Sequence, residues 1–233
     1  MDDHLRRLWR HRGATLPTPR RGPRQQLDLD EILAAGIEIA DASGLEAVST
    51  RAVAARFGKT AMALYPYVGT KENLLALMQD QATAMPVLDL SPSGLAEALR
   101  AWATALFEVY LAHPWLTERP WSQASQGPHE QDWLEALLGI FERFAVPAGS
   151  RAPAVTMLYA TTRATAQTAA AYRRLTENDL EQWRARAAAI PESFPLSAAL
   201  PPITPHWADA PRAGLHAAVG LLAAGLVAAE PPA

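Results

Sequence analysis

The stretch that decides the fold runs from residue 27 to residue 78, with the sequence LDLDEILAAGIEIADASGLEAVSTRAVAARFGKTAMALYPYVGTKENLLALM. Its apolar residues recur at the spacing of short helices, and glycines interrupt that pattern at Gly44 and Gly58. We interpret the stretch as three short helices and the start of a fourth. A glycine-containing turn separates the second helix from the third.

Capping residues indicate where the first two helices begin and end. The first helix is expected to start near Asp28 or Asp30, because an acid there accepts exposed amides and suits the positive end of the helix dipole. Gly44 is expected to end this helix as a left-handed C-cap. Ser49 is a good N-cap for the second helix, which Gly58 ends.

The third helix is predicted to be short. Thr60 can cap it, and Pro66 limits its length because proline cannot donate to a helical hydrogen-bond ladder. The fourth helix is expected to begin at Thr70 or Lys71 and to run to about Ala84. A helix-turn-helix of this kind is a common DNA-reading unit.

Residues 1–26 form a basic segment ahead of the helices, with seven arginines against two aspartates. Residues 13–26 are rich in proline and glycine, which favours an extended arm, while residues 5–9 suit a helical turn before it. Residues 27–85 carry four basic and eight acidic side chains. If the helices bind DNA, the arm must therefore supply much of the phosphate attraction. The alternative is that the arm is a solvated tail.

Composition limits the remaining possibilities. The chain has 233 residues, of which 49% are hydrophobic and 19% charged, so it can bury a core. It has no cysteine, which excludes disulfides, zinc ribbons, iron–sulfur clusters and thiol nucleophiles. The first residues lack the apolar segment of a secretory signal, and a cytoplasmic protein is expected.

The rest of the chain has helical periodicity and no strand-like alternation, so the predicted fold class is all-α. A proline-rich loop is expected over residues 191–211. The helices are predicted at residues 92–113, 129–145, 152–175, 178–190 and 212–229.

Residues 27–78 resemble the DNA-binding domain of the tetracycline-repressor (TetR) family of bacterial regulators. The most specific part of the resemblance is the spacing from Gly58 through Leu64 and Tyr65 to Lys71. The other matching residues are Ala35, Ala40, Gly44, Leu45, Ala54, Phe57, Val68, Leu74 and Leu75. The resemblance implies an N-terminal three-helix helix-turn-helix domain and a C-terminal helical ligand-binding and dimerisation domain. The expected divisions are a basic arm at 1–26, the DNA-binding domain at 27–85 and the effector and dimerisation domain at 86–233.

The resemblance also implies roles in DNA binding. The third helix would lie in the major groove, the tyrosines would contact phosphates, and Lys71 would meet a phosphate at a helix start. The base-facing alanines and methionine have no hydrogen-bonding side chain, so part of the specificity would rest on DNA shape or on the arm. The candidate DNA-binding residues are Arg20, Arg21, Arg24, Ser49, Arg51, Lys59, Thr60, Ala61, Met62, Tyr65, Tyr67 and Lys71.

A ligand cavity is expected among the aromatic residues of the C-terminal domain, since such cavities are mostly apolar with a few polar anchors. Tyr159 and Arg163 share a helical face, and Arg163 is a candidate anchor for an anionic or carbonyl-bearing ligand if that face points inward. If the face points outward, it is a solvated stripe. The candidate ligand-binding residues are Trp102, Tyr110, Trp133, Tyr159 and Arg163.

The sequence therefore predicts a ligand-responsive repressor that binds a palindromic operator as a homodimer, with a small-molecule effector and no cofactor. The dimer surface is expected at residues 152–190 and 212–229. The last helix is short for a bilayer, and we expect no membrane contact. A metal site is not expected, because His129-Glu130 lacks the second histidine of a zinc motif. No catalytic constellation stands out, so an enzyme is not expected; the alternative is a helical ligand-binding or scaffold protein of the same fold.

Overall fold

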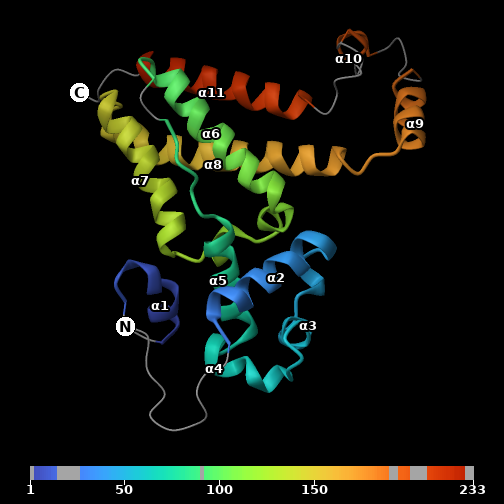
Figure 1. Ribbon diagram of the computed structural model, residues 1–233. Coiled ribbons are helices and arrows are strands. Elements are labelled where there is room, and N and C mark those ends of the chain that lie inside the picture. The colour runs from blue at the N-terminus through green and yellow to red at the C-terminus, as the bar shows by residue number, and fades with distance from the viewer. Residues whose placement is uncertain (1–2, 15–26, 90–91, 189–193, 200–208, 229–233) are drawn as a thin grey trace.

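The structure is a computed structural model that describes residues 3–14, 27–89, 92–188, 194–199 and 209–228. All regular elements in these ranges are helical. The chain forms two halves, seen in Figure 1, with α2 to α5 in the lower half and α6 to α11 in the upper half. Helix α5 points from the lower half towards the upper one.

The first two predicted helices are present with the expected N-caps, but the second helix ends at Ala55 and not at Gly58. Helix α2 spans Leu29–Ser43, and the Asp28 carboxylate accepts hydrogen bonds from the amides of Asp30 and Glu31. It ends at Gly44, which has a φ of 81° that glycine adopts readily. The ψ of 167° is extended, so Gly44 is not the left-handed helical C-cap expected from the sequence. Helix α3 spans Thr50–Ala55, and Ser49 Oγ accepts from Ala52 N at 3.0 Å.

The third helix differs from the sequence prediction because it is divided in two. A 3-10 turn, η3 (Ala61–Ala63), is followed by a short helix, α4 (Tyr65–Val68), with Pro66 in its first turn, where a missing amide is tolerated. Thr60 precedes η3 but makes no side-chain capping hydrogen bond. Helix α5 spans Lys71–Ala82, and the side chain of Thr70 caps it by accepting from the amide of Asn73.

An N-terminal helix packs beside these elements. Helix α1 (Asp3–Leu8) and the 3-10 turn η1 (Arg10–Arg12) lie against α5, and Leu8 is fully buried there. Figure 1 shows α1 next to α5 and below α7. A helical turn at this place agrees with the sequence, whereas its docking was not predicted; the extended arm over residues 15–26 lies outside the described residues.

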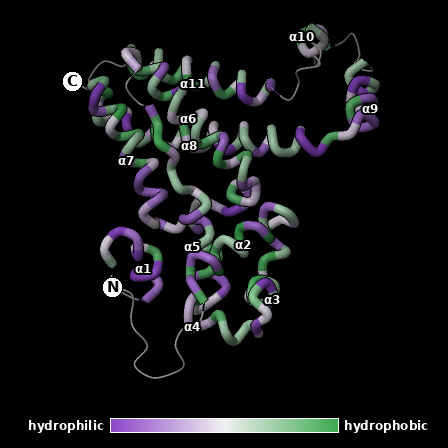
Figure 2. Tube along the Cα trace, viewed as in Figure 1, coloured by the Kyte–Doolittle hydropathy of each residue, from purple (hydrophilic) through white to green (hydrophobic). Residues whose placement is uncertain are grey.

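The upper half is a layer of mutually packed helices. Helices α6, α8 and α11 contact one another, and α7 packs on α6, α8 and the end of α5. Its elements are α6 (Leu95–Ala112), η4 (Pro114–Thr117), η5 (Trp121–Gln123), α7 (Pro128–Arg143), α8 (Ala148–Tyr172), α9 (Glu177–Ala188), α10 (Pro195–Ala198) and α11 (Ala210–Ala228). Helix α9 projects from the layer in Figure 1, and Figure 2 shows its hydrophilic character.

Helix α11 is long and apolar enough to cross a membrane if judged by length and composition alone. In the fold it packs against α6 and α8. Leu215, Val219, Ala223 and Leu226 are its buried apolar stripe. One side of α11 is thus buried in the fold, whereas Leu221 and Val227 on the rest of the helix are exposed.

Two of the polar contacts that join the halves involve aspartates near helix ends. At the end of α2, Asp41 accepts a hydrogen bond from Trp115 Nε1 at 2.8 Å and lies 2.9 Å from His113 Nδ1. At the end of α5, the Asp80 carboxylate accepts from the amide of His129 at 3.1 Å, in the first turn of α7. Asp80 therefore caps a helix of the opposite half, where a negative charge also suits the dipole.

Candidate nucleic-acid interface and ligand cavity

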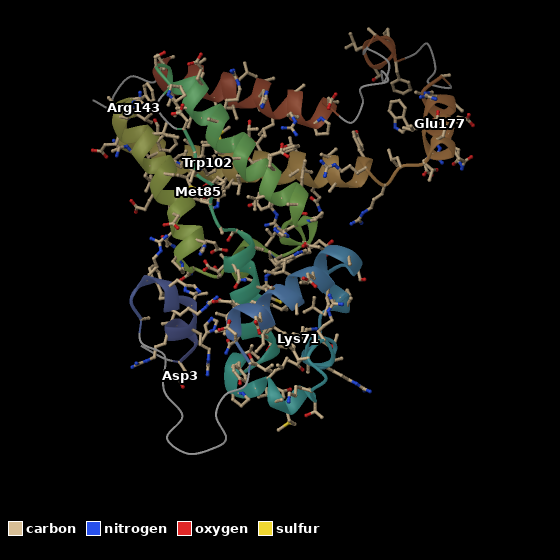
Figure 3. The ribbon with its side chains drawn as sticks, viewed as in Figure 1. Asp3, Lys71, Met85, Trp102, Arg143 and Glu177 are labelled. Atoms are coloured by element: carbon tan, nitrogen blue, oxygen red, sulfur yellow. The ribbon has the colours of Figure 1, made fainter. Side chains whose placement is uncertain are left out.

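The segment from Ala61 to Lys71 presents side chains on the outside of the lower half. Leu64 and Val68 are buried and anchor the segment, whereas Met62 is 73% exposed and Tyr65 is 41% exposed. Lys71 is exposed as the first residue of α5, and Figure 3 shows it in the lower half. A methionine and a lysine on one exposed surface suit a thymine methyl and a phosphate, respectively.

The remaining predicted DNA-binding residues take different positions. The hydroxyl of Ser49 is engaged as a helix cap, and the hydroxyl of Tyr67 accepts the amide of Leu27 at 3.1 Å. A phenol that accepts one hydrogen bond still has its own proton to donate. Arg51, Lys59 and Thr60 are exposed and Ala61 is half-buried, whereas Arg20, Arg21 and Arg24 lie outside the described residues.

Arginines of the N-terminal segment contact the protein itself. Arg10 pairs with Asp30 and donates to Gln81 Oε1 at 3.0 Å, and Arg7 donates to the carbonyl of Pro66 at 3.2 Å. Burial alone would raise the pKa of Asp30, but the hydrogen bonds from Arg10 and His11 outweigh it and lower that pKa. Part of the positive charge of this N-terminal segment is thus engaged in ion pairs and hydrogen bonds within the protein.

The upper half contains a cavity of about 350 Å³ between α5, α6, α7 and α8. Its apolar wall includes Leu106, Leu116, Leu134 and Val155. Its polar wall includes Gln79, Thr83, Arg119, Gln126, Glu130 and Gln131. An apolar cavity of this size with several polar groups is typical of small-molecule sites.

Four of the five predicted ligand-binding residues line the cavity: Tyr110, Trp133, Tyr159 and Arg163. Trp102 lies behind this wall, fully buried, in edge-to-face contact with Trp133 and Tyr159 at centroid distances of 5.8 and 5.0 Å. Figure 3 shows Trp102 inside the upper half. Its indole donates to the carbonyl of Trp133 at 3.0 Å, so it supports the wall from behind.

Arg163 points inward, which settles the alternative left open by the sequence. Its Nε donates to the carbonyl of Thr117 at 3.0 Å, and its Nη2 contacts the carbonyls of Thr117 and Arg119. The side chain therefore holds the η4 turn while it lines the cavity. These hydrogen-bond partners of the guanidinium are backbone carbonyls and not carboxylates.

A polar network that the sequence analysis missed crosses the cavity wall. Gln79 Nε2 donates to Glu130 Oε1 at 2.5 Å, and Arg119 Nε donates to Gln79 Oε1 at 2.5 Å. The amides of Ser125 and Gln126 donate to the two oxygens of Glu130 at 3.1 and 2.8 Å. The bonds from Ser125 and Gln126 are local, whereas Gln79 lies 40 residues from Arg119 and 51 from Glu130, and no spacing in the sequence marks that contact.

Burial sets the ionisation of the cavity groups. It raises the pKa of Tyr110 to about 12, and it also raises the pKa of Tyr159, with a smaller contribution from Tyr110. It lowers the pKa of Arg119, an effect that the nearby Glu130 carboxylate opposes. At neutral pH the phenols are hydrogen-bond donors, and the cavity holds two guanidiniums against the one carboxylate of Glu130.

A metal site would need a group of ligand side chains, in the cavity or elsewhere in the fold. Within the described ranges, no group of three or more His, Cys, Asp or Glu side chains is arranged to hold a metal ion.

Comparisons with known proteins show which proteins this chain and its fold resemble. No family model matches the chain. The HTH-type transcriptional repressor DrrR1 of Streptomyces coeruleorubidus is 37% identical over 174 residues, a match to 72% of this chain; the chain spans 64% of that protein's length.

Solved structures from Streptomyces coelicolor share the fold over most of this chain. ActR without ligand matches with a TM-score of 0.71 and 22% identity, over 88% of this chain and 98% of ActR. The TetR family protein ActR in complex with actinorhodin matches with a TM-score of 0.70 and 25% identity, over 86% and 97% of the two chains. The TetR regulator SCO7222 matches with a TM-score of 0.65 and 23% identity, over 87% and 98%. By its helix-turn-helix sequence, its fold and these relatives, the chain belongs to the TetR family.

Proposed function

We propose that this protein is a ligand-responsive transcriptional repressor that binds a palindromic operator as a homodimer. In this proposal residues 1–26 are a basic arm, residues 27–85 form the DNA-binding domain, and residues 86–233 bind the effector and dimerise. The repressor name of the relative DrrR1 supports the assignment.

One observation carries the proposal: both ends of α5 belong to candidate sites. Lys71 begins the helix on the exposed surface beside α4, and Gln79 near its other end lines the cavity. A helix of 12 residues is about 18 Å long, so a shift at the cavity is transmitted by a rigid element to the DNA-facing end. An effector that binds one position of α5 better than the other would change operator affinity.

The chemistry of the cavity supports a small-molecule effector. Its excess of guanidinium over carboxylate and its two neutral phenols suit a mostly apolar molecule that carries an oxygen acceptor. ActR, which shares the fold, has been solved in complex with actinorhodin and with (S)-DNPA. These two compounds are therefore reasonable first probes.

A surface of α8 and α11 supports the homodimer. Met157 is 54% exposed and Leu221 is 77% exposed, and an apolar groove lined by both residues and by Leu222 runs between the helices. Large exposed apolar side chains on adjacent helices are typical of a protein interface. A second copy of the chain that packs α8 and α11 here would place two recognition segments on one DNA face.

The alternative is a ligand-binding or scaffold protein of this fold that does not read DNA. The apolar base-facing residues Ala61 and Met62 favour it, whereas exposed Lys71 and Tyr65 favour a DNA reader. The relatives are named as transcriptional regulators. We propose that this chain likewise acts as a regulator and not as an enzyme, and that it is cytoplasmic.

The test is selection of duplexes from a random-sequence library with the purified protein, followed by affinity measurement over a range of salt. The proposal expects enrichment of a palindrome with half-sites about 34–36 Å apart and a steep salt dependence. Actinorhodin and (S)-DNPA are then added to the complex. Selection that enriches no sequence would favour the scaffold alternative.

A further inference from the structure

The side-chain amide of Gln79 lies between two charged groups of the cavity wall. It donates to the carboxylate of Glu130 on α7 and accepts from Arg119 in the loop that follows η4. Gln79 is 9% exposed, so its amide depends on these two partners. A buried amide that loses one partner costs roughly the desolvation of that group, which makes the position of Gln79 sensitive to both.

Of the two partners of the Gln79 amide, Arg119 is the one that a ligand can draw away more easily. It is 8% exposed, and the charge that acts on it in the cavity wall is that of Glu130, to which Gln79 and not Arg119 is hydrogen-bonded. Its other hydrogen bond goes to the carbonyl of Gln123 at 3.3 Å. Glu130, by contrast, has both oxygens taken by backbone amides. An anionic oxygen in the cavity is therefore a better acceptor for Arg119 than the neutral amide of Gln79.

The next residue on α5 is tied down independently of the cavity. Asp80 accepts amides at the start of α7 and does not line the cavity. The Asp80 contact is also closely packed, since a Cβ at Gly127 would overlap the Asp80 carboxyl group. Gln79 and Asp80 thus anchor α5 at adjacent positions. A ligand in the cavity can reach Gln79 but not Asp80.

We propose that Gln79 is the residue through which an anionic effector acts on α5, by taking Arg119 away from the Gln79 amide. The inference rests on the proposed function and adds the chemical class of the effector, an apolar body with an anionic oxygen. When Arg119 turns to the effector, Gln79 Oε1 loses its donor while Asp80 stays bound. Helix α5 then shifts about Asp80 until the amide is satisfied again, and Lys71 moves with it.

The test uses two probes with the same apolar body. 1-Anilinonaphthalene-8-sulfonate carries an anionic group, and N-phenyl-1-naphthylamine lacks it; both fluoresce when they enter an apolar site. Binding is followed by that fluorescence, and operator affinity by the anisotropy of a labelled duplex selected with this protein. In wild type, the sulfonate at saturation should weaken operator binding by about fivefold or more, and the neutral probe by less than about twofold.

The informative variant is Gln79→Met, which keeps the length of the side chain and removes both hydrogen bonds. The sulfonate should still bind, as Arg119 remains, but release should fall below about twofold. Gln81→Met is the matched control, because it also removes a side-chain hydrogen bond of α5, the one from Arg10, at a residue that does not line the cavity. It should release as wild type does.

Gln79→Glu provides a second variant that keeps a polar side chain, in case Gln79→Met does not fold. The carboxylate at position 79 pairs with Arg119 and shares one proton with Glu130, whose oxygen lies where the Gln79 amide donated, so the sulfonate concentration for half release should rise about tenfold. Equal release of Gln79→Met and wild type at saturation, or an unchanged concentration for Gln79→Glu, overturns the assignment of Gln79.

Other outcomes separate this inference from the proposed function. A wild-type protein that selects an operator but is released equally by both probes, or by neither, overturns the anionic effector and leaves the repressor proposal standing. A protein that selects no duplex overturns the proposed function itself.

Discussion

Arg12 in η1 forms an ion pair with Asp132 on α7, 120 residues later in the chain. The contact joins the N-terminal segment to the upper half, while Arg10 in the same segment pairs with Asp30 in the lower half. Residues 3–12 therefore span the joint between the halves. The two parts of the N-terminal region have different expected roles, because the docked part is structural and the arginines of residues 20–24 remain candidates for DNA.

These roles predict different effects of two changes. Deletion of residues 1–14 removes Leu8 from its buried site and should lower the stability of the lower half by about 2–5 kcal/mol. Replacement of Arg20, Arg21 and Arg24 by alanine should leave the melting temperature unchanged and weaken operator binding, with a smaller salt slope. Thermal melts and salt-dependent binding of both variants check this. Equal operator affinity of the triple variant and wild type would show that the arm is a bystander.

Lys71 is expected to neutralise one phosphate. Lys71→Ala should weaken binding to all sequences to a similar extent and reduce the salt slope by about one unit. Glu72→Ala is a suitable control, since Glu72 is the exposed neighbour in the same turn. This substitution removes a charge of the opposite sign. An affinity of the Lys71 variant that matches wild type at every salt concentration would remove the phosphate contact.

The groove of α8 and α11 predicts the dimer surface. Leu222 is half-buried in that groove, and Leu222→Arg should place an unpaired charge in the interface. Sedimentation should show a monomer or an aggregate with poor operator binding. Val87→Arg, at a fully exposed position in the linker before α6, should sediment as wild type does. If the Leu222 variant remains a DNA-competent dimer, the two copies meet elsewhere.

The close contact of Gly127 and Asp80 predicts an unusual glycine effect. Gly127→Ala should destabilise the protein by about 1–3 kcal/mol, because its Cβ would overlap the Asp80 carboxyl group and push the end of α5 from α7. Gly139→Ala is the control inside α7, the helix that Gly127 precedes, and no atom lies near the added Cβ there; it should stabilise by about 0.5–1 kcal/mol. Urea unfolding of both variants measures the difference. Two variants of equal stability would contradict the packing of this joint.

The buried phenols predict a loss of stability in alkali. Burial raises the pKa of Tyr110 to about 12, above the value near 10 of an unfolded tyrosine. Unfolding above pH ~10 thus releases a proton, so the free energy of unfolding falls by roughly 1.4 kcal/mol per pH unit as pH rises towards 12. Tyr110→Phe should lessen this slope, and Tyr65→Phe, at an exposed position, should not. Urea unfolding between pH 9 and pH 11 is the measurement.

Much of the lower half could be predicted because its signals act within a few residues. Asp28, Ser49 and Thr70 each cap the helix that starts beside them, and their hydrogen bonds span only two or three residues. Thr60 is the exception, because the chain forms a 3-10 turn there and divides the third helix at Leu64. Such local choices between helix types depend on packing as well as on the capping residue.

The sequence by itself determined the helical fold class, the helix-turn-helix and an aromatic cavity wall that includes Tyr110, Trp133 and Tyr159. Only the tertiary structure decided that Trp102 lies behind this wall, that α1 docks on α5, and that Gln79 joins Arg119 to Glu130. The physical reason is the range of the interactions. Helix caps and apolar periodicity are properties of neighbouring residues, whereas a buried polar contact between residues 40 or 51 positions apart exists only once the helices that carry them have packed.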